Sequence, residues 1–414
     1  MSWRRVWLAL FLGCLSLLFC CAEEKEITDE MRKSMEEARN LSLFINNVIR
    51  RHPRNVRPNA GGEKVMVDIE FKVISFGEIK EANMEYSLDI FFRQWWYDSR
   101  FAHNYSMPFT MAADPTELFW TPDTYFWNVK SANYHRVTRE NMRVMINPDG
   151  KIYFSARITL TCQCEMDLHL YPLDTQECPL RIESYAHTVA DVDYRWKGGE
   201  TQGVEIVSEE MAQFDLLGVR TDTKKSTNSK GAFASLKATF RFRRRMDFYL
   251  SSIYVPEVIL VVLSWTTFFI TPTAVPARTA LSITTILTTI LLSSSVNSGM
   301  PKREKGNEIK GVSYMKSIDH FMLISFGFIF AALIEYIIVL NSPSRFTKCF
   351  PMLFRTYSIP EEAQLHKSDG SIANRKPAEP SKTHWIDRFS RYFFPISYSI
   401  FFLAYWIHYQ SQRQ

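Results

Sequence analysis

The chain has 414 residues, with 49 Lys and Arg against 44 Asp and Glu, which gives a formal net charge of +5. This small charge bias argues against a nucleic-acid-binding protein, and 15 Gly and 18 Pro exclude collagen-like and low-complexity sequences. The mean hydropathy of −0.16 is that of a soluble protein. Apolar residues nevertheless concentrate after residue 248, whereas the first half of the chain is polar.

The first 22 residues have the layout of a secretory signal peptide. Arg4 and Arg5 precede an apolar stretch that begins at Val6, and the segment ends in small residues at Ala22. A membrane anchor is the alternative, but the apolar stretch is shorter than the ~20 residues that a span needs. We therefore expect residues 1–22 to be cleaved and the next domain to be exported. Two acceptor patterns for N-glycosylation agree with export, at Asn40 and Asn104.

The region after the predicted signal peptide changes from a helical pattern to a strand-like pattern. Residues 27–50 have a helical period, and from about 63 to 245 the chain consists of short alternating runs separated by turn signals. Many short strands at this spacing predict an antiparallel β-sandwich. We assign residues 23–247 to this domain, with a helix at its start.

Four apolar stretches follow, each close to the length that crosses a bilayer. If the N-terminal domain is outside, the C-terminus is outside too, and the basic loop 342–387 is cytoplasmic, in agreement with the positive-inside tendency. Spans one to three occupy 248–341, and the fourth lies within 388–414. The predicted limits are 248–270, 276–296, 318–340 and 389–407.

The second stretch is rich in Ser and Thr, which are costly in a membrane unless they face water or a bundle interior. A pore lining is one interpretation, and packing of hydroxyls between helices is the other. At helical spacing, one face would collect Ala280, Thr284, Leu287, Leu291 and Ser294.

Cys164 and Cys178 enclose thirteen residues with Tyr-Pro-Leu-Asp among them, a segment that resembles the namesake loop of the Cys-loop receptors, the pentameric ligand-gated ion channels. Trp-Thr-Pro-Asp at 120–123, Leu-Ser-Trp at 263–265 and Pro-Ala-Arg at 276–278 are similar to motifs of the same family. The resemblance implies a disulfide between Cys164 and Cys178, five subunits around a pore, and a four-helix transmembrane bundle below the β-sandwich. Cys162 pairing with Cys178 is the alternative.

The start of the second span resembles the anion-selective branch, the glycine- and GABA-type receptors. Pro276, Ala277 and Arg278 open the second span. Cation channels of the family carry a Glu ring at about Ala277, and that carboxylate is absent here, whereas a ring of Arg278 would favour anions. The alternative is that Arg278 only reaches the interface and selectivity lies elsewhere. Leu287 resembles the hydrophobic gate of the family, and Leu291 would add a second apolar ring.

The resemblance also implies an agonist site between subunits. Its principal face would use aromatic side chains, a carboxylate and the capping loop, although each aromatic could instead belong to the sandwich core. The complementary face would bind a carboxylate through an Arg, for which a surface salt bridge is the alternative. The principal residues are Tyr125, Trp127, Glu183, Ser184, Tyr185 and Phe233, and the complementary ones are Phe91, Arg93 and Ser155.

These two faces suit a small amino acid such as GABA, glycine or β-alanine. The Lys/Asn/Ser-rich capping loop departs from the family pattern, so a biogenic amine remains an alternative.

Coupling to the pore would use Glu81 with Arg244, and Tyr171, Pro172 and Asp174 of the Cys-loop. The arginine run around Arg244 could instead be a membrane-flanking anchor.

The chain is thus expected to be an agonist-opened chloride channel subunit in the plasma membrane, as a homo-pentamer or hetero-pentamer. An enzyme is not expected, because no His/Asp/Ser or metal-binding cluster stands out and the nine His are scattered. No cofactor, metal or nucleic acid is expected either. A cation channel, or a subunit that conducts only with partners, are the alternatives. Glu257 in the first span and a charged connection at 299–311 depart from the family pattern.

Overall fold

The computed structural model describes residues 29–112, 114–298, 300, 314–341 and 385–413. The predicted signal peptide, nearly all of the connection 299–311 and nearly all of the loop 342–387 therefore lie outside the described residues. The chain divides into two units, which are described separately. One consists of Met1–Met166 with Thr175–Arg244, and the other of Asp167–Asp174 with Arg245–Gln414.

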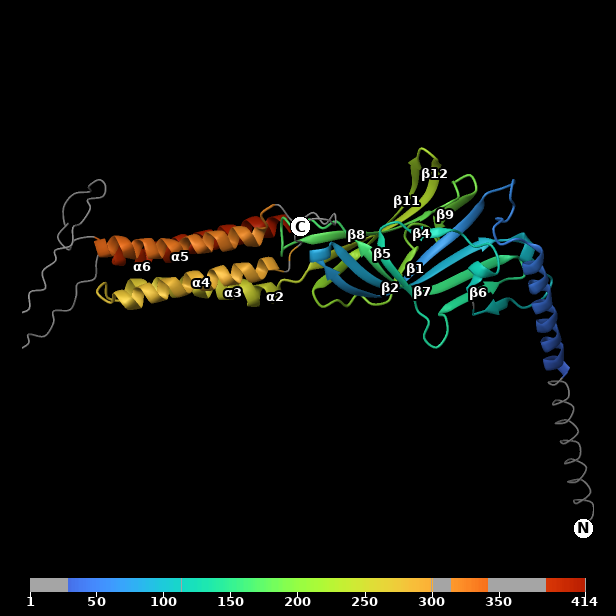
Figure 1. Cartoon of the computed structure of the whole chain (residues 1–414), viewed down its shortest axis with the longest axis horizontal. Coiled ribbons are helices and arrows are strands. Elements are labelled where there is room, and N and C mark those ends of the chain that lie inside the picture. The colour runs from blue at the N-terminus through green and yellow to red at the C-terminus, as the bar shows by residue number, and fades with distance from the viewer. Residues whose placement is uncertain (1–28, 113, 299, 301–313, 342–384, 414) are drawn as a thin grey trace, which may run out of the picture. The chain divides into compact units, whose positions relative to one another are not determined.

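The first unit contains two β-sheets (Figure 1). An eight-stranded sheet has the order β10-β1-β2-β7-β6-β3, with β5 paired to β7 and β9 to β1, and a four-stranded sheet has the order β11-β12-β8-β4. The strands are β1 (Val65–Lys80), β2 (Glu85–Tyr97), β3 (Phe109–Met111), β4 (Thr124–Phe126), β5 (Val129–Tyr134), β6 (Met142–Ile146), β7 (Lys151–Gln163), β8 (Thr175–Ser184), β9 (Val192–Trp196), β10 (Val204–Ile206), β11 (Phe214–Asn228) and β12 (Gly231–Arg244).

Period-two alternation places one face of each sheet in the core. In β2 every second residue is buried, and the residues between are partly exposed. Phe76 of the eight-stranded sheet packs edge-on against Phe240 and Phe242 of the four-stranded sheet, with ring centroids 5.3 Å apart in both pairs. The predicted β-sandwich is therefore confirmed, because the two alternating faces bury each other.

A helix at 29–51 precedes the strands. Leu41, Ile45 and Val48, spaced as one helical face, are buried. The backbone N–H and the hydroxyl of Ser106 both donate to Glu37, each at 2.8 Å. These bonds lower the pKa of Glu37. The two predicted glycosylation acceptors, Asn40 on the helix and Asn104, are both exposed.

The second unit is helical. Among its described residues, three segments are long and apolar enough to cross a membrane: Asp247–Phe269, Val275–Ser298 and Ser317–Asn341. A fourth helix, α6, is as long but more polar, and it extends beyond the predicted 389–407 at both ends. The elements are α2 (Asp247–Tyr249), the π-helix η4 (Leu250–Tyr254), α3 (Val255–Trp265), the 3-10 helix η5 (Thr266–Phe269), α4 (Val275–Ser298), α5 (Ser317–Asn341) and α6 (Trp385–Gln412).

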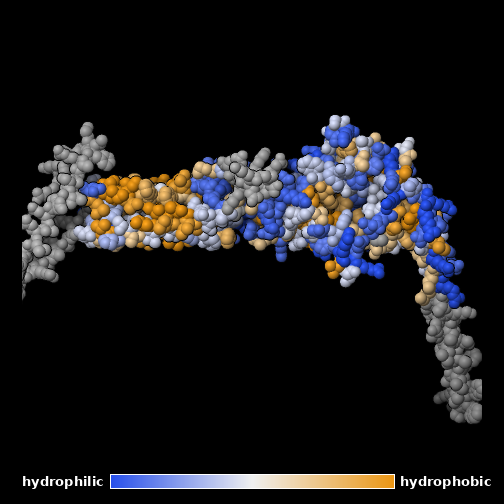
Figure 2. Space-filling view, in the orientation of Figure 1, coloured by the Kyte–Doolittle hydropathy of each residue, from blue (hydrophilic) through white to orange (hydrophobic). Residues whose placement is uncertain are grey.

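Two features of these helices follow from their sequence. Pro256 has no N–H to donate to the carbonyl four residues earlier, and the widened π-helical turn lies at that place. On the face shown in Figure 2, apolar side chains cover the part of the helical unit formed by α5 and α6. Ile400, Leu403 and Ile407 of α6 are 61–70% exposed. Water would not favour such a surface, whereas lipid would. The described helices therefore form a transmembrane region.

Candidate functional site

The predicted principal face lies on the outer side of the four-stranded sheet. Tyr125 of β4 stands opposite Glu183 of β8, which stands opposite Ser235 of β12. The Tyr125 hydroxyl donates to the Glu183 carboxylate at 3.2 Å, and the ring of Tyr185 meets that of Tyr125 edge-on at 5.3 Å. Partial burial and the neighbouring Glu183 carboxylate raise the pKa of Tyr125, so its hydroxyl remains protonated at neutral pH.

Two basic side chains form the next row of this face. The β4–β8 pairing continues to Trp127 and Arg181, and Arg181 stands opposite Lys237 of β12. The Arg181 guanidinium lies 5.0 Å from the centre of the Trp127 ring and 2.6 Å from Glu183. The contact with Glu183 has the distance of an ion pair but not the direction of a hydrogen bond. We call Tyr125, Trp127, Arg181, Glu183 and Tyr185 the aromatic face.

The aromatic face can hold a cation. Glu183 is only 5% exposed, whereas Tyr185 is 75% exposed and Trp127 58%. A nearly buried carboxylate next to accessible rings provides both a counter-charge and π faces for an ammonium group. Arg181 competes for both, because it already covers the Trp127 ring and approaches Glu183. A ligand cation that binds at this face would therefore be repelled by the positive charge of Arg181.

Ser184 and Phe233 differ in their placement. Ser184 is buried, and its hydroxyl lies within hydrogen-bond distance of two acceptors, the Asp123 carboxylate at 2.8 Å and the His187 carbonyl at 2.9 Å. The structure therefore does not place Ser184 with the surface rings. Phe233 is partly buried on β12, two residues before Ser235, so the register carries it toward the Tyr185 end of the aromatic face.

The predicted complementary face lies on the outer side of the eight-stranded sheet. Phe91 and Arg93 both point outward from β2, and both are partly exposed. Arg93 stands between Ser155 of β7 and Glu70 of β1. The structure thus brings Phe91, Arg93 and Ser155 together on one surface, which we call the arginine face.

The arginines of this face already have carboxylate partners. Arg93 forms an ion pair with Glu70 and lies 4.0 Å from Glu205. Arg157, which shares the face, forms a 2.5 Å contact with Asp89. An Arg held by one carboxylate still has N–H groups to offer a second, but its net charge is offset. The salt-bridge alternative for Arg93 and the ligand-binding one are therefore both compatible with this geometry.

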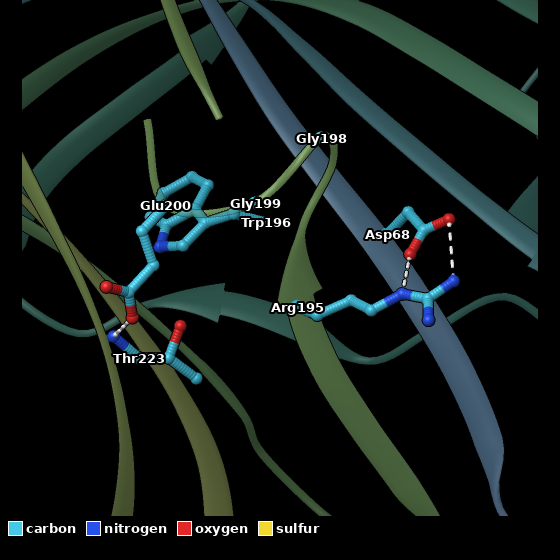
Figure 3. A pocket seen from close by; sticks show the side chains of 7 residues that line it. All are labelled: Asp68, Arg195, Trp196, Gly198, Gly199, Glu200 and Thr223. Carbon is cyan, nitrogen blue, oxygen red and sulfur yellow. Dashed lines mark hydrogen bonds and ion pairs between the residues drawn. The ribbon is translucent and has the colours of Figure 1, made fainter. Parts of the chain in front are cut away.

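A cation and a pocket lie beside the arginine face. The Lys197 ammonium lies 3.3 Å from the centre of the Trp95 ring, and partial burial lowers the pKa of Lys197. Nearby, a pocket of about 340 Å³ surrounds the turn after Trp196 (Figure 3). None of the predicted ligand residues lines it, and its charged groups are engaged in the Asp68–Arg195 pair and the bond from the Thr223 N–H to Glu200. The lining residues are Asp68, Arg195, Trp196, Gly198, Gly199, Glu200 and Thr223.

The predicted coupling pair is in contact within the first unit. Arg244 is fully buried, forms an ion pair with Glu81, and lies 4.5 Å from the centre of the Phe214 ring. Tyr171, Pro172 and Asp174 belong to the second unit and are all buried there. The Ser317 hydroxyl at the start of α5 donates to the Tyr171 carbonyl at 2.6 Å, and Tyr171 packs edge-on against Tyr249.

The predicted pore face of α4 is exposed in this subunit, and the opposite face is buried. Pro276 and Ala277 at its start are exposed as well, and its first turn has no acidic residue. Arg278 is different, because its side chain is completely buried and paired with Asp387 of α6. The exposed residues predicted to line the pore are Ala280, Thr284, Leu287, Leu291 and Ser294.

The cysteines are arranged as the loop motif implied. Cys164 and Cys178 form a disulfide, and Cys162 is free and buried, which excludes its pairing with Cys178 in this structure. Burial raises the pKa of the Cys162 thiol to about 12. Glu257 of α3 is also buried, and neither of its carboxylate oxygens has a hydrogen-bond partner among the described residues.

Sequence reasoning missed several charged partners. Arg181 was predictable from the chain, because it lies two residues before Glu183 on the same strand. Glu70 was predictable once β1 and β2 are paired, because it stands directly across from Arg93. Asp387 was not predictable, since 109 residues separate it from Arg278. Among the described residues no group of three or more His, Cys, Asp or Glu could hold a metal ion.

Comparison with known proteins agrees with this arrangement. Residues 42–246 match the neurotransmitter-gated ion-channel ligand binding domain, and residues 253–352 match the neurotransmitter-gated ion-channel transmembrane region. The chain is 35% identical to the gamma-aminobutyric acid receptor subunit beta-like of Drosophila melanogaster, over 78% of this chain and 66% of that protein. It is 31% identical to the human gamma-aminobutyric acid receptor subunit gamma-3, over 89% of this chain and 90% of that protein.

These matches cover the β-sandwich and the transmembrane region and include relatives over nearly their full length. They also exclude an enzyme, because the family consists of ligand-gated ion channels. The chain therefore belongs to the neurotransmitter-gated ion-channel family, the Cys-loop receptors, and is a subunit of such a channel.

Proposed function

We propose that this subunit forms a pentameric chloride channel of the plasma membrane that opens when a small amino acid binds between subunits. Residues 23–247 would be extracellular, 248–341 would supply three spans, 342–387 would be cytoplasmic, and 388–414 would contain the fourth span and an extracellular C-terminus. Asn40 and Asn104 would carry glycans on the extracellular side. Both the exposure of these asparagines and the apolar surface of the helices support this topology.

The observation that carries chloride selectivity is the start of α4. Its first turn has no acidic residue, and Pro276 and Ala277 are exposed there. The N-terminal end of a helix has a partial positive charge and unpaired N–H groups, which attract anions. Five such ends around a pore, without a carboxylate, favour chloride over sodium. Ala280, Thr284, Leu287, Leu291 and Ser294 would line the pore, with Leu287 as the gate.

The agonist is proposed to be GABA or an amino acid of similar size. The relatives are named as gamma-aminobutyric acid receptor subunits. Glu183 with Tyr125 and Tyr185 would hold the ammonium group, and Arg93 with Ser155 and Phe91 on the neighbouring subunit would hold the carboxylate. Trp127, Ser184 and Phe233 would shape the principal side, Ser184 from below the surface.

Expression of the full chain in Xenopus oocytes tests these proposals. GABA, glycine and β-alanine are applied, and the reversal potential is measured in solutions of varied chloride and sodium. We expect a current whose reversal potential follows the chloride gradient. A reversal potential that follows sodium would contradict anion selectivity. Surface protein without any current would indicate a subunit that needs partner subunits.

An amine-gated channel is a second candidate, favoured by the pairing of Arg93 with Glu70. If Glu70 fully offsets Arg93, a ligand with an ammonium group and no carboxylate would bind better than a zwitterion. A biogenic amine such as tyramine is therefore applied in the same recordings. A lower half-maximal concentration for tyramine than for GABA would favour this candidate.

A further inference from the structure

Arg278 and Asp387 form a two-bond ion pair inside the helical unit. The Arg278 Nη1 donates to one carboxylate oxygen of Asp387 at 3.0 Å, and Nη2 donates to the other at 3.1 Å. Neither side chain has exposed surface. The pair joins α4, the proposed pore helix, to the first turn of α6. Parallel bonds of this kind fix the position of the guanidinium as well as its charge.

The N-terminal ends of α4 and α6 are also connected through η5 and the turn that follows it. Arg278 donates to the backbone carbonyl of Ile270, with the Nε bond at 3.0 Å. Arg391, one helical turn after Asp387, donates to the carbonyl of Phe268 at 3.1 and 2.9 Å. Arg391 of α6 therefore holds η5 directly, and Asp387 of α6 holds the turn after η5 through Arg278.

Glu335 of α5 is a second carboxylate in this cluster. It is 6% exposed, and its carboxyl group faces that of Asp387. It is close enough to Asp387 and Arg278 to interact electrostatically with both. Asp387 makes two hydrogen bonds to the guanidinium, whereas no hydrogen bond joins Glu335 to Arg278 among the described residues.

We propose that Asp387 is a positioning residue for the ion pathway: it keeps the Arg278 side chain inside the subunit, neutralises its charge and clamps the N-terminal end of α4 to α6, while Arg391 holds the preceding η5 to α6. The expected effect on conduction rests on the proposed function, in which α4 lines the pore. The clamp between α4 and α6 does not depend on that function. It changes the predicted role of Arg278, because the Asp387 carboxylate offsets the positive potential that Arg278 would otherwise produce at the pore mouth.

A double-mutant cycle measured without agonist tests the clamp. Arg278→Gln, Asp387→Asn and the double variant are purified as full chains in detergent, and their melting temperatures are compared. Each single change leaves one buried charge without its partner, so we expect each to lower the melting temperature by roughly 5 °C or more. The double variant removes both charges, and we expect it to melt no lower than either single variant.

Glu335→Gln is the matched control, because it makes the same acid-to-amide change in the same cluster. We expect it to leave the melting temperature close to that of the parent, and Asp387→Glu to restore most of the loss caused by Asp387→Asn. Strictly additive losses for Arg278→Gln and Asp387→Asn, or equal losses for Glu335→Gln and Asp387→Asn, would overturn the clamp.

Single-channel recording tests the effect on conduction, with GABA as the agonist. Removal of the Asp387 carboxylate takes away the bonded counter-charge of Arg278, so the positive potential at the N-terminal end of α4 rises and with it the local chloride concentration. We expect Asp387→Asn to increase the conductance for chloride that leaves the cell by about twofold, and Glu335→Gln to leave it unchanged.

An unchanged conductance in Asp387→Asn, at normal surface expression, would overturn the electrostatic role. If GABA opens no channel in the parent chain, the proposed agonist fails, and the melting cycle still decides whether Asp387 clamps Arg278.

Discussion

Arg244, whose side chain is completely buried, forms an ion pair with Glu81 at the turn between β1 and β2. A buried guanidinium is costly unless a carboxylate compensates it, so the two charges depend on each other. The Phe214 ring covers the guanidinium on another side. This pair was predicted from the family resemblance, and the structure brings the two side chains together.

Charge reversal tests whether this pair couples ligand binding to the pore. We expect Glu81→Arg and Arg244→Glu to raise the half-maximal agonist concentration by about tenfold each. The double reversal restores opposite charges at the same places, and we expect it to recover at least part of the loss. The measurement is a concentration–response curve for each variant at verified surface expression. Unchanged gating in all three variants would remove the pair from the coupling path.

Leu287 provides a test of the gate. Leu287→Thr replaces a ring of apolar side chains by hydroxyls, which makes water entry into the closed pore easier. We expect a resting chloride current and a half-maximal agonist concentration lower by about five- to a hundredfold. Ile286→Thr is the control, because Ile286 packs toward the cluster around Val261 rather than along the proposed pore face. The same gain of function in both variants would argue against a specific gate at Leu287.

Glu183 provides a test of the ammonium site. Glu183→Gln keeps the shape of the side chain but removes the charge next to Tyr125 and Tyr185. A charge-assisted hydrogen bond contributes about 1.5–3 kcal/mol, so we expect the half-maximal concentration of GABA to rise by about ten- to a hundredfold. Ser235→Ala, on the same row of the sheet, is the control for local packing. A shift below threefold in Glu183→Gln would exclude Glu183 as the counter-charge.

Glu70 provides a test of the carboxylate site. Glu70→Gln releases Arg93 from a partly exposed ion pair, and such pairs contribute about 0.2–1 kcal/mol. If Arg93 binds the agonist carboxylate, we expect the half-maximal concentration of GABA to fall by roughly threefold and that of tyramine to stay unchanged. Glu205→Gln is the matched control, since Glu205 pairs mainly with Lys72. A rise for GABA would instead show that Glu70 positions Arg93.

Cys162 provides a test of burial in the sandwich. Its pKa is raised to about 12 because the thiol is buried, and the thiolate is the reactive form. The thiolate is therefore scarce at every pH below the raised pKa, and we expect no labelling by a maleimide at pH 8.5. The experiment uses the folded, oxidised protein with Cys349→Ser and peptide mass spectrometry, with denatured protein as the positive control. Labelling of Cys162 without denaturant would show that the strand pairing around it opens.

The aromatic face shows how far pattern reasoning reaches. Tyr125 and Trp127 lie two residues apart, as do Glu183 and Tyr185, and period-two alternation places each pair on one side of its strand. The register between β4 and β8 then decides that Tyr125 meets Glu183 and that Trp127 meets Arg181. Strand alternation is local, but register depends on the whole sheet, so the presence of Arg181 on the Trp127 ring was not predictable.

The sequence by itself determined the two main regions of the chain. An alternating strand region with an enclosed cysteine loop is followed by apolar stretches of membrane length. These are local properties of composition and period, and they identified the family before any contact was known. Only the tertiary structure decided the partners of Arg93 and Arg278, which are Glu70 and Asp387. A charge that the fold shields from water must be compensated by whichever carboxylate the fold brings to it, and that carboxylate can be distant in sequence.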